Sequence, residues 1–459
     1  MTLSYDASGL QPSIAGEERG VSDEDRAQLA ERLATALKDV MAANRRGELG
    51  FIDCPDIDPG PIVEWAEQKR AGDFTDQVVI GIGGSSLGAR AIYESMSGSA
   101  GRGQDGLRTH FAENVDPVGV ANLFDSLDLT KTLFVVVTKS GSTIETMTKF
   151  WYAFDRLVDE VGPEQASEHF VAITGPDNAG LRAMVDEYGF DSFAVPPNVG
   201  GRFSVLTAVG LVPLALAGYD IAALLGGAKK ARENARGTEV AQNPLLRASA
   251  DVYTLYERGV DQIVMMAYSD QLLGLADWFR QLWAESLGKA KNRHGEDVHV
   301  GMTPIKALGA VDQHSQVQLY MEGPNDKHMV FLEVGSFERE FHIPEREGLP
   351  DSLAHLSGRS LSEILRAELR GTRRALQEAG RATTTWRFER VEPEAIGAFI
   401  FSWELITAIV GELFDINAFD QPGVELGKKI AHGLLGREGF ERWAELAEGG
   451  DEGGGHTIA

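Results

Sequence analysis

The chain has 459 residues, of which 43% are hydrophobic and 24% are charged, as in ordinary soluble globular proteins. Its 43 basic and 69 acidic residues give a formal net charge of -26, which argues against nucleic acid or an anionic membrane as a general partner. A single cysteine, Cys54, excludes an intramolecular disulfide framework and a cysteine-based zinc site, so we expect an inert structural thiol. The first residues show no secretory signal pattern, and cytoplasmic residence is the expectation.

Three regions are distinguished by their patterns. Residues 1–70 contain a polar arm followed by amphipathic helical segments, so we expect a helical N-terminal extension. From there strands and helices alternate, which indicates α/β domains whose parallel sheets are covered by helices on both faces. The predicted strands are 77–83, 108–114, 132–138 and 169–174, followed by 261–269, 327–335 and 383–391. The simplest division gives two such domains, at residues 71–240 and 241–459. The second includes the C-terminal helices and a tail after Glu448 that we expect to be disordered.

Two long apolar segments require a choice between a membrane span and a buried helix. The segment 205–217 is too short to cross a bilayer and contains Pro213. The segment 395–414 is interrupted by Ser402 and Glu404. We therefore expect both to be buried helices.

Residues 131–146, KTLFVVVTKSGSTIET, combine a strand with a cluster of hydroxyl groups around one lysine. The apolar run lacks polar alternation, as expected for a parallel strand covered on both faces. A strand, a tight turn at Gly141 and a helix N-terminus would together direct backbone N–H groups at an anion, so we predict a phosphate site in the hydroxyl turn, residues 138–143. Hydroxyls that only cap the helix are the alternative. The glycine spacing of a nucleotide-binding Walker A loop is absent.

A second turn, GIGGSSLG at 81–88, also follows a predicted strand. We call it the glycine turn, and we expect both turns to face one crevice, because the carboxyl ends of parallel strands share one sheet edge. The glycines do not match the dinucleotide fingerprint, since Ser86 occupies the last glycine position, so no nicotinamide cofactor is expected. The glycines allow a ligand to approach the backbone, and Ser85 stands where a helix begins.

Two segments carry candidate catalytic groups whose roles the residues alone leave open. Arg202 follows two glycines and precedes an apolar helix, so it faces either the solvent or a bound anion. In WFRQLWAESLGK, 278–289, a helix would place Gln281, Glu285 and Lys289 on one face. That face is either solvated or, beside two tryptophans, part of a site.

The histidines are less informative. His314 stands among polar residues before a predicted helix that Ser315 would begin, and such a histidine is either structural or catalytic. His294 and His299 lack the spacing of a zinc-binding HExxH motif, and no metal site is predicted from them.

Six segments between about residue 77 and residue 436 resemble, in the same order, the shorter bacterial form of the glucose-6-phosphate isomerase (phosphoglucose isomerase) family. They are GIGGSSLG, TKSGSTIET, VGGRFSVLTAVG, WFRQLWAESLGK, DQHSQVQLYMEGP and QPGVELGKKIA. The resemblance implies two tandem sugar-isomerase (SIS) domains of three-layer α/β/α type and a homodimer. It also implies an interconversion of glucose 6-phosphate and fructose 6-phosphate that needs neither metal nor cofactor.

The resemblance gives each candidate residue a role. Glu285 matches the general base that moves a proton between C1 and C2, and Arg202 matches the guanidinium beside the enediolate. His314 and Lys428 match the pair that opens the sugar ring, and the histidine is expected from the neighbouring subunit. The implied substrate-binding positions are Thr138, Lys139, Ser140 and Thr143 for the phosphate, Gly84 and Ser85 in the same crevice, and Gln281 and Gln421.

Some positions and activities stay open. Gly141 stands where longer family members carry a bulky aromatic residue, and the segments 291–299 and 337–360 match nothing assignable. Additional activity on mannose 6-phosphate or an amino-sugar phosphate is an alternative within the same chemistry. A non-catalytic sugar-phosphate sensor would not need the four catalytic candidates and would usually carry a basic DNA-binding module. A metal-dependent isomerase on a β-barrel is opposed by the α/β pattern.

Overall fold

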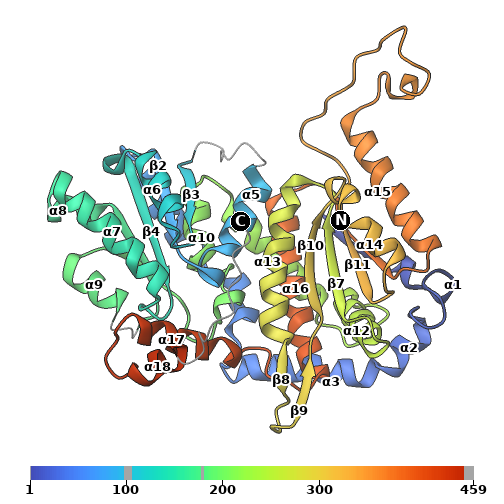
Figure 1. The fold of residues 1–459 in the computed structure, drawn as a ribbon, viewed down its shortest axis with the longest axis horizontal. Helices are drawn as coiled ribbons and strands as arrows, with labels where there is room; N and C mark the ends of the chain where they lie inside the picture. The colour runs from blue at the N-terminus through green and yellow to red at the C-terminus, as the bar shows by residue number, and fades with distance from the viewer. Residues whose placement is uncertain (1, 98–105, 177–179, 449–459) are drawn as a thin grey trace.

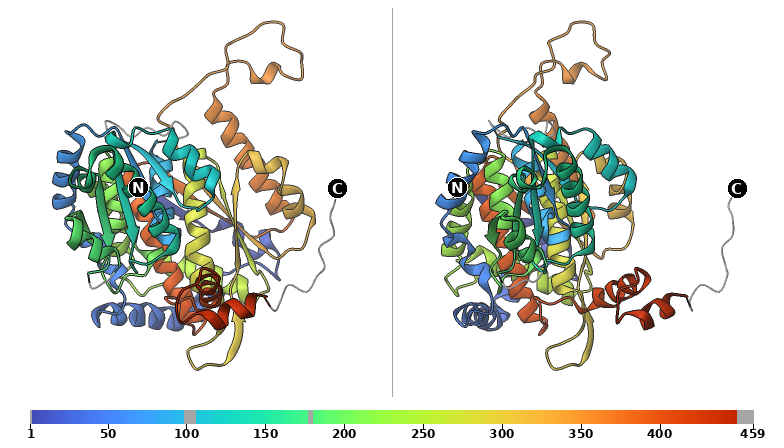
Figure 2. Two further views of the ribbon diagram at one scale, coloured as in Figure 1. Left: turned by 60° about the vertical axis from the view of Figure 1, so that its left-hand side comes forward. Right: turned by 90° about the vertical axis from the view of Figure 1, so that its left-hand side faces the viewer.

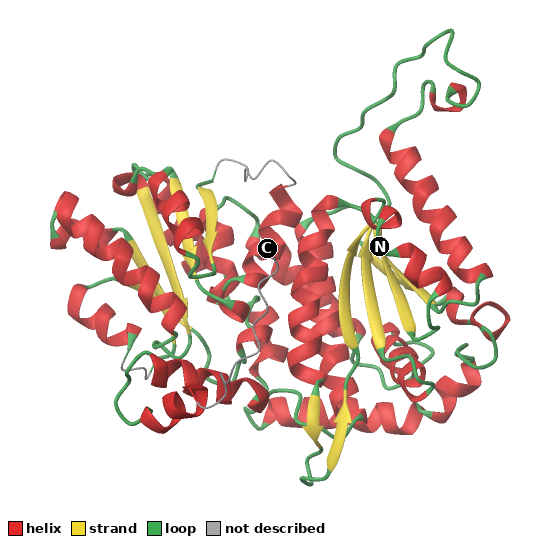
Figure 3. Ribbon diagram, viewed as in Figure 1, coloured by secondary structure: helices red, strands yellow, loops and turns green. Residues whose placement is uncertain are grey.

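The computed structural model describes residues 2–97, 106–176 and 180–448, and the disordered tail expected after Glu448 lies outside these residues. Two five-stranded sheets stand side by side, with helices between them and on their outer faces (Figure 1, Figure 3). The predicted α/β class with two sheets is therefore confirmed.

The first sheet is entirely parallel, in the strand order β3-β2-β4-β5-β6. Every residue of β4 is buried, as its unbroken apolar sequence predicts. Four strands coincide with the predicted ones, whereas β6 was not predicted, because its sequence DSFA is short and lacks an apolar run. The strands are β2 (Asp76–Ile80), β3 (Arg108–Ala112), β4 (Thr132–Thr138), β5 (Phe170–Thr174) and β6 (Asp191–Ala194).

The second sheet has the order β1-β12-β11-β7-β10 and is parallel except for β1, which runs antiparallel to β12. Residues 3–6, which were predicted to lie in a polar arm, instead form the strand at one edge of this sheet, and helices follow in the rest of residues 1–70. The edge strand β10 was also missed, since Pro304 and Lys306 interrupt its apolar pattern. The strands are β1 (Leu3–Asp6), β7 (Gln262–Ala267), β10 (Thr303–Leu308), β11 (Lys327–Val334) and β12 (Thr383–Phe388).

Helices supply both the outer layers and the packing between the sheets. The N-terminal ones are α1 (Pro12–Ala15), α2 (Asp23–Gln28), α3 (Ala30–Arg45) and α4 (Gly60–Arg70). Those of the first α/β region are α5 (Leu87–Ser97), α6 (Pro117–Asp125), α7 (Ile144–Val161), α8 (Pro163–Glu168), α9 (Leu181–Tyr188), α10 (Ala208–Leu216) and α11 (Ile221–Asn234). The remainder are α12 (Pro244–Glu257), α13 (Asp270–Leu287), α14 (Val317–Glu322), α15 (Leu361–Glu378), α16 (Pro393–Leu413), α17 (Glu425–Leu434) and α18 (Glu441–Glu448).

The centre of the molecule is formed by α16 and the helices around it. Helix α16 is long and apolar enough to cross a membrane, but 89% of its most apolar 18-residue stretch is buried, and it packs against α3, α11, α12 and α13. Burial raises the pKa of Glu404, in the middle of this helix, well above its usual value. Cys54 is also buried, and desolvation raises the pKa of its thiol, so the expected inert thiol fits its surroundings.

Two segments project from this body. Residues 336–360, which we call the projecting arm, extend beyond the second sheet before α15 (Figure 1). The helices α17 and α18 pack on each other at the periphery, and Figure 2 shows them reaching away from the sheets. A two-stranded hairpin, β8 (Lys289–Lys291) and β9 (Asp297–Val300), follows α13 and contains the segment 291–299, whereas the other unassigned segment, 337–360, lies in the projecting arm.

Candidate active site

A cleft of about 810 Å³ opens at the carboxyl edge of the first sheet. The hydroxyl turn after β4 and the glycine turn after β2 both line it, which confirms that these two turns face one crevice. The candidate residues along its wall are Gly84, Ser85, Ser140, Thr143, Arg202, Gln281, Glu285, Gln421 and Lys428. The wall therefore combines groups from both sheet regions and from the C-terminal helices.

The hydroxyl turn concentrates three side-chain oxygens. Thr138 Oγ1 and Thr143 Oγ1 are 2.9 Å apart, and Ser140 Oγ lies 3.3 Å from Thr143 Oγ1. Gly141 adopts a φ of 68°, the left-handed conformation that lets the chain turn back toward α7. Thr143 is the N-cap residue of α7, yet its side chain makes no capping hydrogen bond. The hydroxyls therefore face one another rather than the helix backbone, which weakens the capping alternative.

Lys139 does not extend its ammonium into this group of hydroxyls. Its Nζ donates to the carbonyl oxygens of Pro197 and Val199, at 2.7 and 2.8 Å, and Lys139 is not among the residues that line the cleft. Burial lowers the pKa of this lysine. Its side chain thus anchors the segment that leads to Arg202, and its contact with a phosphate stays a prediction.

The glycine turn packs directly on the backbone beside Arg202. A Cβ atom on Gly84 would lie 2.3 Å from the carbonyl carbon of Gly201, so any side chain there would push the two segments apart. Gly83 has a φ of 56°, and a Cβ there would meet the amide of Gln281. The glycines are therefore required for the close approach of three segments around the cleft.

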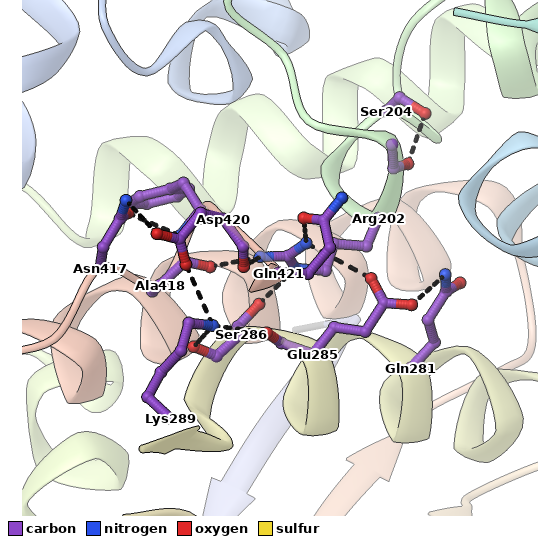
Figure 4. Close-up of polar contacts among 12 residues, drawn as sticks. Arg202, Ser204, Gln281, Glu285, Ser286, Lys289, Asn417, Ala418, Asp420 and Gln421 are labelled. Atoms are coloured by element: carbon purple, nitrogen blue, oxygen red, sulfur yellow. Dashed lines mark hydrogen bonds and ion pairs between the residues drawn. The ribbon is translucent and has the colours of Figure 1, made fainter. Parts of the chain in front are cut away.

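Arg202 is held rigidly at the base of the cleft, with 5% of its surface exposed (Figure 4). Its Nε donates to Ser286 Oγ at 2.7 Å, and its Nη2 donates to the carbonyl oxygens of Ala418 and Asp420 at 2.6 and 3.0 Å. Burial lowers the pKa of its guanidinium, against the opposing effect of nearby carboxylates. Of the two open possibilities, the structure excludes a solvent-facing surface arginine.

Glu285 lies near the C-terminal end of α13, with its side chain 35% exposed toward the cleft. Gln281, one turn earlier, donates to Oε1 at 3.1 Å, and Arg202 Nη1 lies 3.4 Å from Oε2. The same Nη1 donates to Gln421 Oε1 at 2.8 Å. The spacing of four residues on one helix therefore places an amide and a carboxylate side by side, as predicted, with a fixed cation opposite (Figure 4).

Lys428 lies on α17 and lines the cleft. Its Nζ makes an ion pair with Glu425 at 2.9 Å, and its side chain is 57% exposed. The hydrogen bond from Lys428 lowers the pKa of Glu425. Both residues line the cleft, so an ammonium group is available on the wall facing α13.

His314 is not brought to this cleft within one chain. It ends a short 3-10 turn, Val311–His314, which follows β10 next to Ala267 and Tyr268, just before α13 begins. Glu285 lies fifteen residues after the start of that helix, which places it roughly 22 Å from the helix start along the axis at 1.5 Å per residue. The expectation that Ser315 begins the next helix is wrong, because its hydroxyl donates to Asp312 and α14 starts without a side-chain cap.

Two groups were not singled out by sequence reasoning. Ser286 accepts from Arg202, and Ala418 and Asp420 supply backbone oxygens to the same guanidinium. A serine beside a candidate base is a weak signal, and backbone oxygens leave none, because they do not depend on the side chain. Only the folded arrangement reveals these contacts.

Comparisons with known proteins agree with this geometry. The profile of the phosphoglucose isomerase family matches residues 57–439. The glucose-6-phosphate isomerase of Carboxydothermus hydrogenoformans is 41% identical over 449 residues, which are 96% of this chain and 96% of that protein. The crystal structure of a hypothetical protein from Thermus thermophilus is 37% identical, with a TM-score of 0.84 over 95% of this chain and 100% of that one.

The fold extends to more distant structures. A crystal structure of a glucose-6-phosphate isomerase from Chlamydia trachomatis has a TM-score of 0.81 at 22% identity, covering 98% of this chain and 92% of that one. The family profile spans most of the chain, and the relatives align along nearly their whole length. The resemblance inferred from the six segments is thus confirmed, and the chain is an enzyme of the phosphoglucose isomerase family.

Proposed function

We propose that this enzyme interconverts glucose 6-phosphate and fructose 6-phosphate, with Glu285 as the base that transfers a proton between C1 and C2. The observation that carries the proposal is the position of the Glu285 carboxylate, between Gln281 and Arg202, in the same cleft as the hydroxyl turn. One end of the cleft suits a phosphate, and the other end holds a base beside a cation. An aldose–ketose isomerase needs both ends.

Removing a proton next to a carbonyl group creates an enediolate whose oxygen carries negative charge. Arg202 suits the stabilisation of this charge, because Ser286, Ala418 and Asp420 hold its Nε and Nη2 in place before the substrate arrives. Its Nη1 is the donor among the residues that line the cleft, where it contacts Glu285 and Gln421. Preorganised donors of this kind are worth about 2.7–4 kcal/mol each in the transition state. Glu285 retains the proton between its removal from one carbon and its delivery to the other, so the step consumes no proton overall.

The hydroxyl turn would hold the phosphate, which takes no part in the bond changes. Ser140, Thr143 and the start of α7 offer hydroxyl and backbone donors to an anion. The glycine turn, with Gly84 and Ser85, completes the opposite wall. Binding energy from this end fixes the reacting carbons relative to Glu285.

Ring opening requires an acid and a base near the ring oxygen, and we assign this step to Lys428 and to His314 of a second subunit. The position of His314 beside the N-terminal end of α13 supports its supply in trans, because Glu285 lies near the other end of this helix. The projecting arm exposes Phe341 and Leu353, at 66% and 46%, which suits contact with a second copy of the chain. The functional unit proposed is therefore a homodimer.

The test is a coupled assay from fructose 6-phosphate to glucose 6-phosphate, with and without a metal chelator. The purified chain should be active and insensitive to the chelator, and Glu285→Gln should lower kcat by at least about 10²-fold. Mannose 6-phosphate and an amino-sugar phosphate, assayed in parallel, would reveal additional substrates. Full activity of Glu285→Gln would refute the assignment of the base.

A further inference from the structure

Lys289 is a buried lysine beside the cleft that no step of the proposed reaction uses. It follows α13 directly, is 8% exposed, and is not among the residues that line the cleft. Its Nζ donates to the carbonyl oxygens of Glu285 and Ser286, at 2.7 and 2.9 Å, and lies 3.7 Å from Asp420 Oδ1 (Figure 4). The ammonium therefore contacts the backbone of the proposed base itself.

The contacts satisfy the end of α13. The last carbonyl groups of a helix have no partner within it, and their dipoles attract a cation. In α13 the N–H of Gly288 bonds to the carbonyl of Ala284, and Lys289 covers the next two carbonyls. The backbone of Lys289 is held in turn by pairing with Val300 in the β8–β9 hairpin. The last turn of α13 is thus clamped between the hairpin and the ammonium.

The location of this cation is unfavourable by itself. Lysines at helix C-termini are normally solvated, whereas burial and the charge of Arg202 lower the pKa of Lys289. The charged groups that face it are Arg202, the carboxylate of Glu285 and Asp420. Asp420 also precedes Gln421, the residue that accepts from Arg202, so Lys289 contacts both segments that hold the catalytic pair.

We propose that Lys289 is a positioning residue for Glu285, an inference that rests on the proposed role of Glu285 as the base. The clamp holds the last turn of α13 so that the carboxylate stays between Gln281 and Arg202. A lysine that only stabilised the fold would make the same contacts with the last carbonyl groups of α13. Its replacement would not lower kcat in a protein that remains folded.

The experiment compares Lys289→Met, Lys289→Gln and Lys289→Arg with the matched control Lys291→Met. Lys291 lies two residues further along the same hairpin, is 60% exposed, and pairs with Asp297 away from α13. Steady-state kinetics with fructose 6-phosphate, circular dichroism and thermal unfolding are measured for each variant. These readouts separate the rate, the substrate affinity and the folded fraction.

Lys289→Met should remain folded and lower kcat about 10–100-fold with KM changed less than about threefold, because the base is misplaced while the phosphate site is intact. Lys289→Gln should behave similarly, Lys289→Arg should recover most of kcat, and Lys291→Met should match the wild type.

Wild-type kcat in folded Lys289→Met would overturn the inference. So would a loss of kcat that Lys289→Arg does not recover, or the failure of both uncharged variants to fold, because each would assign the lysine to structure alone. The proposed function is tested separately within the same set. If the wild-type chain were inactive, or Glu285→Gln fully active, that function would fail, whereas an inactive Glu285→Gln beside a fully active Lys289→Met would refute only the role of Lys289.

Discussion

Arg202 and Glu285 face each other across the cleft, with Nη1 of the arginine 3.4 Å from Oε2 of the glutamate. The arginine comes from the segment after the first sheet, and the glutamate comes from the helix after the first parallel strand of the second region. Because the guanidinium is buried and the carboxylate is partly exposed, the cation is fixed while the base remains accessible to a substrate.

Replacing Arg202 should lower the rate far more than it changes substrate affinity. We expect Arg202→Met to reduce kcat about 10²–10³-fold, because a preorganised donor to the developing oxyanion is lost. Arg202→Lys should recover little, since an ammonium cannot reproduce the five hydrogen bonds of the fork. Steady-state kinetics measure both effects, with Arg280→Met as a control on the exposed side of α13. Near-wild-type kcat in Arg202→Met would contradict the role.

Removing one hydroxyl of the hydroxyl turn should weaken phosphate binding. Thr143→Val should lower kcat/KM about 10–100-fold, the effect of losing one hydrogen bond to a charged group, mostly through a higher KM. Thr148→Val is the matched control, because Thr148 lies on the same helix and its hydroxyl only bonds to the carbonyl of Ile144. Equal kinetics for the two variants would show that the turn does not bind the phosphate.

Mixing two inactive variants tests whether His314 acts in trans. In a dimer of Glu285→Gln with His314→Ala, one of the two sites would have both residues intact if the histidine comes from the neighbour. Random reassembly should then restore about a quarter of the wild-type activity, because half of the dimers are mixed and each has one intact site. Refolding the two chains together and separately provides the measurement. No recovery after verified dimer exchange would place both residues in cis.

Salt should affect the encounter with the substrate. The chain carries a net charge of -26, whereas the sugar phosphate is a dianion, so the far field repels the substrate. Raising the ionic strength to about 0.15 M shortens the Debye length to about 8 Å and should raise kcat/KM, because the local cations of the cleft act within that distance. NaCl and KCl should give the same curve. A steady decline from the lowest salt upward would contradict this prediction.

The buried His328 should make the fold sensitive to mild acid. Desolvation lowers the pKa of His328 to about 3, and its Nε2 lies 2.9 Å from Thr384 Oγ1 in the second sheet. In the unfolded chain this histidine binds a proton near pH 6.5. The contribution of the neutral histidine to the unfolding free energy is therefore complete above that pH and is lost progressively as the pH falls toward 3. Between pH 7 and 5 the loss attributable to this histidine is about 2 kcal/mol.

Urea unfolding at the two pH values measures this loss. His328→Gln should reduce the pH dependence of the unfolding free energy by that amount, although the variant is less stable at pH 7. The same substitution at the exposed His355 should leave the pH dependence unchanged. An identical slope for His328→Gln and the wild type would show that His328 does not control the acid response.

The sequence alone determined the strands and turns whose signals are local. The apolar run of β4 and the hydroxyls that follow it are adjacent in the chain, so their pattern predicts both the strand and the anion site. The four-residue spacing of Gln281 and Glu285 similarly predicts that they share a helix face, and helix geometry is independent of the rest of the fold.

Tertiary structure decided what depends on distant segments. The strand β1 pairs with β12, which lies about 380 residues later in the chain, and no local pattern records that partner. Lys139 was predicted among the phosphate ligands, but carbonyl groups near residue 198 bind its ammonium. Arg202 could have faced the solvent, and only oxygens from the segment 418–421 and from α13 give its guanidinium a fixed place. Such contacts form when separate segments pack together, which is why residue types and local spacing cannot specify them.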